Sequence, residues 1–339
     1  MNFKTVFFFL ISFLIGIVIF SLIYDMVGWQ NLGNVLSIFS FKKGFVIFFL
    51  TISIILMGTL RWKTILLSRG RNASFLNLFK AYWAGYSILF LAPILFFGGE
   101  LFRAGVLKKK EIFSWPKSLA SVIIERAMEW AFNIFFIICG LSFFILKTGS
   151  IPKNIYLIFL TLLFVVSLSM VLFCIKIFSR DGMVNFLESH FSEKLNGDAK
   201  EVAQEVFSFF DIENVAMWKA LELSFIRMIL MFLRSFLLLI FLNQNINVWF
   251  AFSILSFHLL AVMIPIPASL GSHEAFQIFA FNALGLSVTA ATAFTLITRS
   301  VEFLVSIIGL VFLFKLAIEL SKETLFEKMD KLLEIKNDQ

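Results

Sequence analysis

Two short stretches, Pro93-Ile-Leu-Phe-Phe-Gly-Gly-Glu100 and Pro267-Ala-Ser-Leu-Gly-Ser-His-Glu274, decide the fold of this chain. Each interrupts an apolar run with proline and glycine, which break a helix, and each ends on a glutamate. Both the prolines and the glutamates are 174 residues apart (93 and 267, 100 and 274). The shared spacing suggests that one structural unit occurs twice.

A second pair of motifs follows these stretches at nearly the same offset. Arg126-Ala-Met-Glu129 and Arg299-Ser-Val-Glu302 are 173 residues apart (126 and 299, 129 and 302). Chance does not readily align four landmarks, so we predict an internal repeat with halves at about residues 44–146 and 219–317. The alternative is a false repeat created by hydrophobic composition.

The composition predicts an integral membrane protein. Of the 339 residues, 60% are hydrophobic and only 15% are charged, whereas soluble domains are roughly half apolar and about a quarter charged. Several apolar runs reach the length of about 20 residues that spans a bilayer. We predict an all-α polytopic membrane helix bundle with about six full spans and two re-entrant broken hairpins. The runs are 5–24, 44–60, 81–99, 130–146, 154–175, 235–273 and 275–298.

Basic residues set the predicted orientation. Clusters around Arg61 and around Lys108, the latter including Arg103, flank the first broken segment, and both clusters should be cytoplasmic. Residues 78–110 would then enter and leave on one side as a re-entrant hairpin; an ordinary span with one basic loop outside is the alternative. Counting spans puts the second hairpin on the opposite side, which predicts the inverted-topology repeat found in many transporters.

The remaining segments complete the predicted organisation. Residues 1–317 form the membrane domain, and residues 179–217 within it are predicted to be amphipathic cytoplasmic helices on the membrane surface. Residues 318–339 form a charged cytoplasmic tail, and both termini are predicted to be cytoplasmic. The net charge of +7 indicates topology signals and contacts with anionic lipid, and no nucleic acid partner is predicted.

Ionisable residues inside the predicted helices are the candidate site. A charge at the bilayer centre costs roughly 2.5–3.5 kcal/mol, so these side chains should face one enclosed polar chamber. Arginine exceeds what simple pairing needs, and a planar guanidinium suits phosphate, so we predict an anionic head group as ligand. The predicted ligands are Arg103, Arg126, Arg227 and Arg299, with Glu100, Glu125, Glu129, Glu274 and Glu302 as charge partners or proton carriers. The alternative is a set of ion pairs that only hold the bundle together.

The tips of the predicted hairpins are a second candidate site for binding an anion. Free N–H groups at Gly98, Gly99 and Gly271 would bind an anion as helix N-termini do, or these glycines only permit tight turning. His273 at the second tip is a further candidate, whereas His258 is interpreted as a core residue. The sequence contains no metal-ligand cluster and no cofactor fingerprint, so no metal, cofactor or catalytic residue is predicted.

Four motifs carry a resemblance to a known family. They are Gly98-Gly99-Glu100-Leu-Phe-Arg103, Ser121-Val-Ile-Ile-Glu125-Arg126, Pro265-Ile-Pro267 through Gly271 to Glu274, and Thr298-Arg299. Over about residues 5–317 the chain resembles the flippase-like membrane domain of lysylphosphatidylglycerol synthases. The resemblance implies a flippase or transporter of anionic phospholipid or polyprenyl-phosphate lipids in a bacterial inner membrane. Membrane lipids, and lipid-modifying enzymes, are the implied partners.

The resemblance also has limits. The synthases carry aminoacyl transfer on a separate cytoplasmic domain that we do not find here, so enzymatic activity is not expected. Where the family commonly has arginine before glutamate, this chain has His273-Glu274, and a histidine binds phosphate only when protonated. One alternative is an integral membrane enzyme or accessory subunit in lipid-linked glycan or phospholipid modification, with Glu100 or Glu274 as base. Another is a scaffold that transports nothing.

Overall fold

The protein is described here from a computed structural model that covers residues 39–70, 73–93, 98–109, 112–147, 198–244, 247–264 and 266–337, with a few isolated positions. Side chains are described as far as residue 319. The predicted spans 5–24 and 154–175, and most of the predicted amphipathic segment before residue 198, lie outside these ranges.

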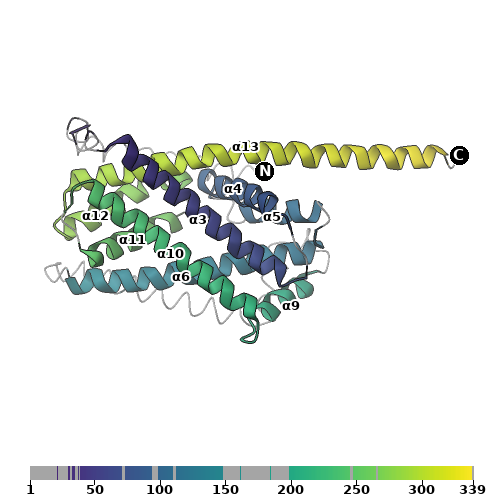
Figure 1. Ribbon diagram of the computed structural model, residues 1–339, viewed down its shortest axis with the longest axis horizontal. Helices are drawn as coiled ribbons and strands as arrows, with labels where there is room; N and C mark the ends of the chain where they lie inside the picture. Colours follow the sequence, from purple (N-terminus) through teal and green to yellow (C-terminus); the bar gives the residue numbers. More distant parts are fainter. Residues whose placement is uncertain are drawn as a thin grey trace.

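Within the described ranges every regular element is a helix (Figure 1). The first half contains α3 (Phe41–Leu67), α4 (Phe75–Leu91), α5 (Gly98–Lys109) and α6 (Trp115–Lys147). The second contains α10 (Val215–Phe241), α11 (Val248–Met263), the 3₁₀ turn η1 (Pro267–Ser269), α12 (Ser272–Ala283) and α13 (Val288–Asn337), and α9 (Ala199–Phe209) precedes it. Helices α3, α6, α10 and the α13 segment Val288–Glu319 are long and apolar enough to cross a membrane. The prediction of a polytopic helical membrane bundle is therefore confirmed.

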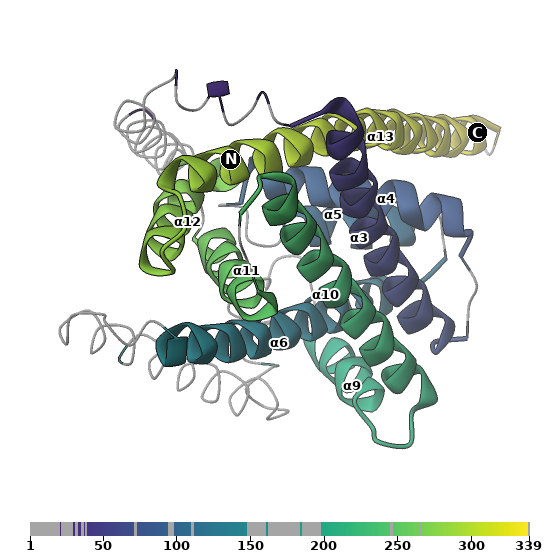
Figure 2. The same ribbon diagram turned by 60° about the vertical axis from the view of Figure 1, so that its left-hand side comes forward.

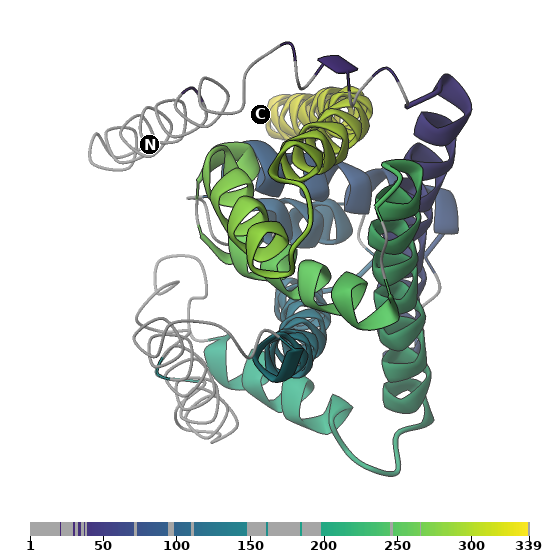
Figure 3. The same cartoon turned by 90° about the vertical axis from the view of Figure 1, so that its left-hand side faces the viewer.

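The two halves match helix by helix. Corresponding helices begin 173 or 174 residues apart (41 and 215, 75 and 248, 98 and 272, 115 and 288). The packing follows the same correspondence, because α4 packs against α13 while α11 packs against α6. Helices α3 and α10 are counterparts and pack against each other (Figures 2 and 3). Each short helix therefore packs against the long helix of the other half, which is the packing expected of a two-fold internal repeat.

Helices α3 and α10 run in opposite directions. Near the start of α3, Lys43 Nζ donates to the carbonyl of Phe241 at the end of α10, at 3.1 Å. Towards the end of α3, Arg61 Nη1 donates to Ser224 Oγ in the first part of α10, also at 3.1 Å. The residue numbers of the contacting pairs thus increase along α3 and decrease along α10. The two helices are therefore antiparallel, as corresponding helices of an inverted repeat must be.

Each half contains a broken pair of short helices. Helix α4 has 17 residues and α11 has 16, fewer than the roughly 20 that a full span needs. Helix α4 ends just before Pro93, and α11 ends before the 3₁₀ turn that begins at Pro267. The breaks predicted from proline therefore occur in both halves.

Helix α9 and the end of α13 cover two other segments with a sequence-based prediction. The apolar face of α9, with Val202, Val206 and Phe209 at most 1% exposed, is buried beside α6. The apolar face of this part of 179–217 thus packs on the bundle, and its place on the cytoplasmic membrane surface stays a prediction. Helix α13 continues to Asn337 without a break, so the charged tail extends the last helix and projects from the bundle (Figure 1); its cytoplasmic location stays a prediction as well.

Small residues allow the exchanged helices to approach closely. Where α11 crosses α6, Ser256 Oγ donates to the carbonyl of Phe136 at 2.9 Å and its side chain lies against Gly140. Where α4 crosses α13, Ser87 Oγ donates to the carbonyl of Ser306 at 2.9 Å and lies against Gly309. Such contacts between small residues hold helices together in membranes, where lipid provides no hydrophobic drive.

Adding a methyl group at either crossing should loosen the bundle. A Cβ at Gly140 would lie 2.8 Å from the carbonyl oxygen of Phe252, and one at Gly309 would lie 2.7 Å from that of Trp83. We expect Gly140→Ala and Gly309→Ala each to destabilise the protein by about 1–3 kcal/mol, measured as a lower unfolding temperature in detergent. Gly105→Ala is the control, because its Cβ would meet nothing within 4 Å. Unchanged stability in all three would contradict the close crossings.

Candidate functional site

A small pocket is lined mainly by helices of the first half, and we call it the first-half pocket. Helices α3, α4, α5, α6 and α10 all contribute to its walls. Three arginines and three glutamates meet apolar and tyrosine side chains there. The lining residues are Ile54, Ile55, Tyr82, Gly85, Tyr86, Leu89, Glu100, Arg103, Glu125, Arg126, Glu129 and Arg227.

Glu125 on α6 lies at the centre of the charges. Its carboxylate pairs with Arg61 of α3 and accepts from Arg103 Nη2 of α5 at 2.9 Å. It also accepts from the hydroxyl of Tyr82 on α4 at 3.1 Å. Glu125 is 0% exposed and Arg61 is 1% exposed. A buried carboxylate needs such partners, since an unpaired charge in the interior is strongly destabilising.

One turn further along α6, a second carboxylate joins more helices. Arg126 pairs with Glu100 of α5, and its Nη1 lies 3.2 Å from Glu129 of its own helix. Arg227 of α10 lies 2.7 Å from the other oxygen of Glu129. Arg126 and Glu129, three residues apart, thus share one face of α6. Together the two carboxylates of α6 connect α3, α5 and α10.

The first-half cluster holds more positive than negative charge. Its arginines are Arg61, Arg103, Arg126 and Arg227, and its glutamates are Glu100, Glu125 and Glu129. Four guanidinium groups against three carboxylates leave one positive charge unbalanced. Unbalanced charge is costly inside a membrane, so the arrangement favours an anion in the pocket.

The second half has a cluster of its own. Glu302 of α13 lies 3.1 Å from Arg234 of α10 and 3.4 Å from Arg299 of α13. The rings of His258 on α11 and His273 on α12 are joined through Nδ1 and Nε2 at 2.6 Å. All five side chains are buried. Among the described residues no group of histidine, cysteine, aspartate and glutamate side chains could hold a metal ion.

The two clusters are built from corresponding positions. Arg61 on α3 donates to Ser224 on α10 at 3.1 Å, and Arg234 on α10 donates to Thr51 on α3 at 3.3 Å. Both the arginines and the hydroxyl residues are 173 residues apart (61 and 234, 51 and 224). The motif pairs at 126 and 299 and at 129 and 302 have the same offset of 173, and the pair at 100 and 274 has an offset of 174. Each half therefore uses an arginine that reaches across the α3–α10 contact.

The predicted site residues divide between the clusters. Arg103, Arg126, Arg227, Glu100, Glu125 and Glu129 surround the first-half pocket, whereas Arg299, Glu302, His273 and Glu274 belong to the second half. Tyr86 of the pocket stacks on Phe90, whose ring centroid lies 6.0 Å from the guanidinium of Arg299. An aromatic pair thus stands between the two clusters.

Several sequence-based assignments need correction. Arg61 and Arg103 were expected in cytoplasmic basic clusters, but both are buried and pair with Glu125. The backbone N–H of Gly271 is not free for an anion, since it donates to Glu274 Oε2 at 2.8 Å. Gly99, with Gly98 at the start of α5, lies against Gly85 and permits close packing. Arg234 and Arg61 were missed as site residues, although their spacing of 173 residues repeats the offset of the motifs.

The fold and clusters define a class: a polytopic helical membrane protein whose inverted halves each bury an arginine–glutamate cluster. Residues 9–309 match the family described as Lysylphosphatidylglycerol synthase TM region, and the chain belongs to this family. A UPF0104 membrane protein of Methanocaldococcus jannaschii is 27% identical over 293 residues, which is 81% of this chain and 85% of that protein. The resemblance seen in the motifs is therefore confirmed.

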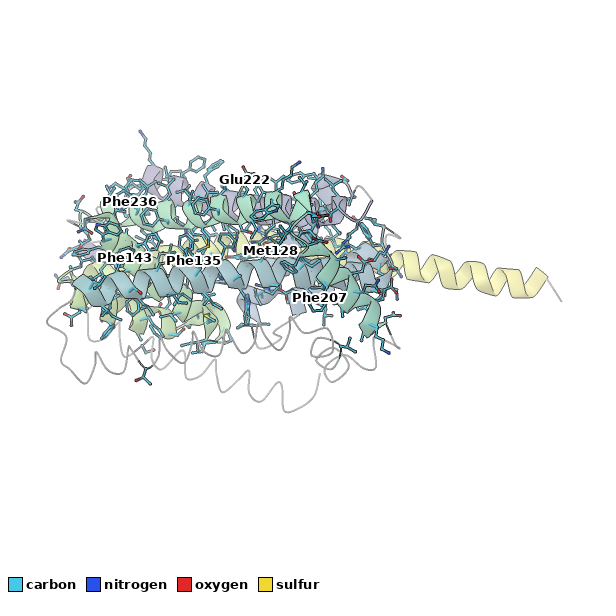
Figure 4. All side chains as sticks on the ribbon, turned by 90° about the horizontal axis from the view of Figure 1, so that it is seen from below. Met128, Phe135, Phe143, Phe207, Glu222 and Phe236 are labelled. Carbon is cyan, nitrogen blue, oxygen red and sulfur yellow. The ribbon has the colours of Figure 1, made fainter. Side chains whose placement is uncertain are left out.

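Removing the central carboxylate should unfold the first half. Glu125→Gln leaves Arg61 and Arg103 facing each other without their shared anion, and breaking a buried pair costs about 3–5 kcal/mol. We expect a large fall in the unfolding temperature in detergent. Glu222→Gln on α10 makes the same charge change at an exposed position (Figure 4) and should have little effect. Equal stability of the two variants would show that Glu125 carries no such role.

Proposed function

We propose that the protein is a lipid transporter of the flippase kind, which moves an anionic phospholipid or polyprenyl-phosphate lipid across a bacterial inner membrane. One observation carries the proposal: a cluster of four arginines and three glutamates borders a pocket built by membrane-spanning and broken helices, and three of the arginines line that pocket. A phosphate in the pocket would supply the missing negative charge. Arginine binds phosphate through two parallel hydrogen bonds, which few other side chains do.

The pocket lining suits an amphipathic ligand. Ile54, Ile55 and Leu89 provide apolar surface beside the charged residues, and Tyr82 and Tyr86 provide rings that carry polar tips. A lipid presents the same combination, with a charged head group joined to an apolar body. We infer that the head group occupies the charged side of the pocket and that the acyl chains remain in the bilayer.

The arginines differ in access to the pocket. The side chains of Arg126 and Arg227 are 17% and 13% exposed, whereas those of Arg103 and Arg61 are 5% and 1% exposed. We therefore assign phosphate contact to Arg126 and Arg227. Arg61 and Arg103 neutralise Glu125 and so hold α6 against α3 and α5.

The alternative of an enzyme receives less support. Glu100 is engaged by Arg126, and Glu274 accepts the N–H of Gly271 at the start of its own helix. Neither of the two candidate bases is therefore uncommitted. We propose both termini on the cytoplasmic side, a membrane domain over residues 1–317, and membrane lipids with lipid-modifying enzymes as partners.

Loss of Arg126 should abolish lipid movement. In proteoliposomes containing fluorescent phosphatidylglycerol, movement between leaflets is followed by quenching from outside. A charge-assisted hydrogen bond contributes about 1.5–3 kcal/mol, so Arg126→Gln should slow transport roughly ten- to a hundredfold. Lys42→Gln removes an exposed charge at the start of α3 and should leave the rate unchanged.

A double variant separates function from folding. Arg126→Gln with Glu100→Gln removes both members of a pair, so no carboxylate is left unpaired. If this variant folds but still moves phosphatidylglycerol at the wild-type rate, the head-group assignment is wrong. Fluorescent phosphatidylcholine and a fluorescent polyprenyl phosphate, tested in parallel, distinguish lipid classes. Equal rates for the zwitterionic and both anionic lipids would contradict an arginine site for anions.

A further inference from the structure

The two halves differ where their broken helices meet. In the first half Gly85 of α4 lies against Gly99 of α5, and Gly85 lines the first-half pocket. The corresponding positions in the second half are His258 and His273, at offsets of 173 and 174 (85 and 258, 99 and 273). Two imidazole rings, 4.7 Å apart between centroids, therefore stand in the second half where two glycine backbones are in close contact in the first.

Hydrogen bonding fixes the protons on these rings. Arginine can only donate, so His258 Nε2, which lies 3.3 Å from Arg234 Nη2, must be an acceptor. His258 then carries its hydrogen on Nδ1 and donates to His273 Nε2 at 2.6 Å. The hydrogen of His273 is consequently on Nδ1, which is buried and meets no acceptor among the described residues. Both rings are neutral in this arrangement, and both acceptor nitrogens are occupied.

Charged groups approach the pair from several helices. Glu302 and Arg299 approach it from α13, and Arg234 approaches it from α10. Glu274, next to His273 on α12, accepts from the N–H of Gly271. Tyr86 of α4 stacks on Phe90 beside Arg299. From α6, the described polar contacts to α11 are backbone carbonyls that accept from serines. One carboxylate oxygen of Glu302 lies 3.1 Å from Arg234 and 4.0 Å from His258 Nε2. Arginine and histidine thus approach the same oxygen.

We propose that the His258–His273 pair is a proton-binding site that controls the second half. A proton from water adds to Nε2 of His258 and displaces the guanidinium of Arg234 from that nitrogen. The new N–H of the imidazolium donates to Glu302, so Arg234 loses His258 as an acceptor and shares Glu302 with it, while the bond to Thr51 stays in place. No other bond is made or broken, and the second half gains one positive charge.

Release of Arg234 from His258 affects the contact between the halves. Arg234 is the counterpart of Arg61 and reaches from α10 to Thr51 on α3. Once released from His258, it can hold an anion as the arginines of the first half do, or let α10 shift against α3. A role of this proton in lipid movement rests on the proposed function. The existence of the proton site does not depend on that function.

Protonation can be measured without transport. The chain has three histidines, and His190→Gln leaves only the two of the pair. In lipid nanodiscs, nitrogen NMR of this variant is followed from about pH 8 down to the lowest pH at which the protein stays folded. We expect both imidazole spectra to change together in one step. Spectra that stay constant, with neutral rings throughout, would overturn the proton site.

Transport provides the second readout. Movement of fluorescent phosphatidylglycerol should change by up to about tenfold per pH unit through the histidine transition, in the wild type and in His190→Gln. The double variant His258→Gly, His273→Gly has the glycines of the first half at both positions. Its rate of lipid movement should not depend on pH. A profile that persists in this double variant would overturn the role of the pair. If it does not fold, His273→Gln provides the same comparison.

The two proposals fail in different ways. Histidines that titrate in a protein that moves no lipid at any pH contradict the proposed function and support the proton site. Lipid movement at a rate that does not depend on pH, together with histidine spectra that do not change, contradicts the proton site and is compatible with the proposed function.

Discussion

The pairing of arginine on α3 and α10 with glutamate on α6 and α13 is the constraint on which the rest of the structure depends. Arg61 meets Glu125, and Arg234 meets Glu302. Charges at this depth are tolerated only when they are enclosed and matched, because hydrocarbon offers them no solvation. The four helices must therefore converge, and the broken helices fill the space around the charges. The reciprocal bonds of the two arginines to the opposite helix make the α3–α10 contact the axis of the repeat.

The same framework supports two different interiors. In the first half, glycines let the two short helices approach closely beside the pocket, and the arginines exceed the carboxylates. In the second half, a histidine pair stands at the corresponding positions, and Arg234 and Arg299 share Glu302. Gln277 takes the place of Arg103, and Thr298 that of Glu125, at offsets of 174 and 173 (103 and 277, 125 and 298). The halves thus share a scaffold and differ in chemistry, which supports a ligand site in one half and a controlling site in the other.

Much of this architecture could be predicted from local sequence. Proline and glycine mark the helix breaks because their backbone effects are local, and the pairs three residues apart follow from helix geometry. The repeat offset needed only the spacing of four landmarks. Arg61 was misplaced because an arginine near the end of an apolar run usually marks a cytoplasmic loop. Its partner on α6 is 64 residues away, and only tertiary packing brings Glu125 to it. The burial of α9 and the joining of His258 to His273 depend on packing in the same way.

Native mass spectrometry of the protein purified from a bacterial membrane tests the central claim most directly, since it identifies lipids that stay bound to the folded protein. We expect wild-type protein to retain an anionic lipid and Arg227→Gln, which changes an arginine assigned to phosphate, to lose that lipid while remaining folded. Retention of the same lipid by both proteins, or of zwitterionic lipid only, would contradict an arginine-based site for anionic head groups.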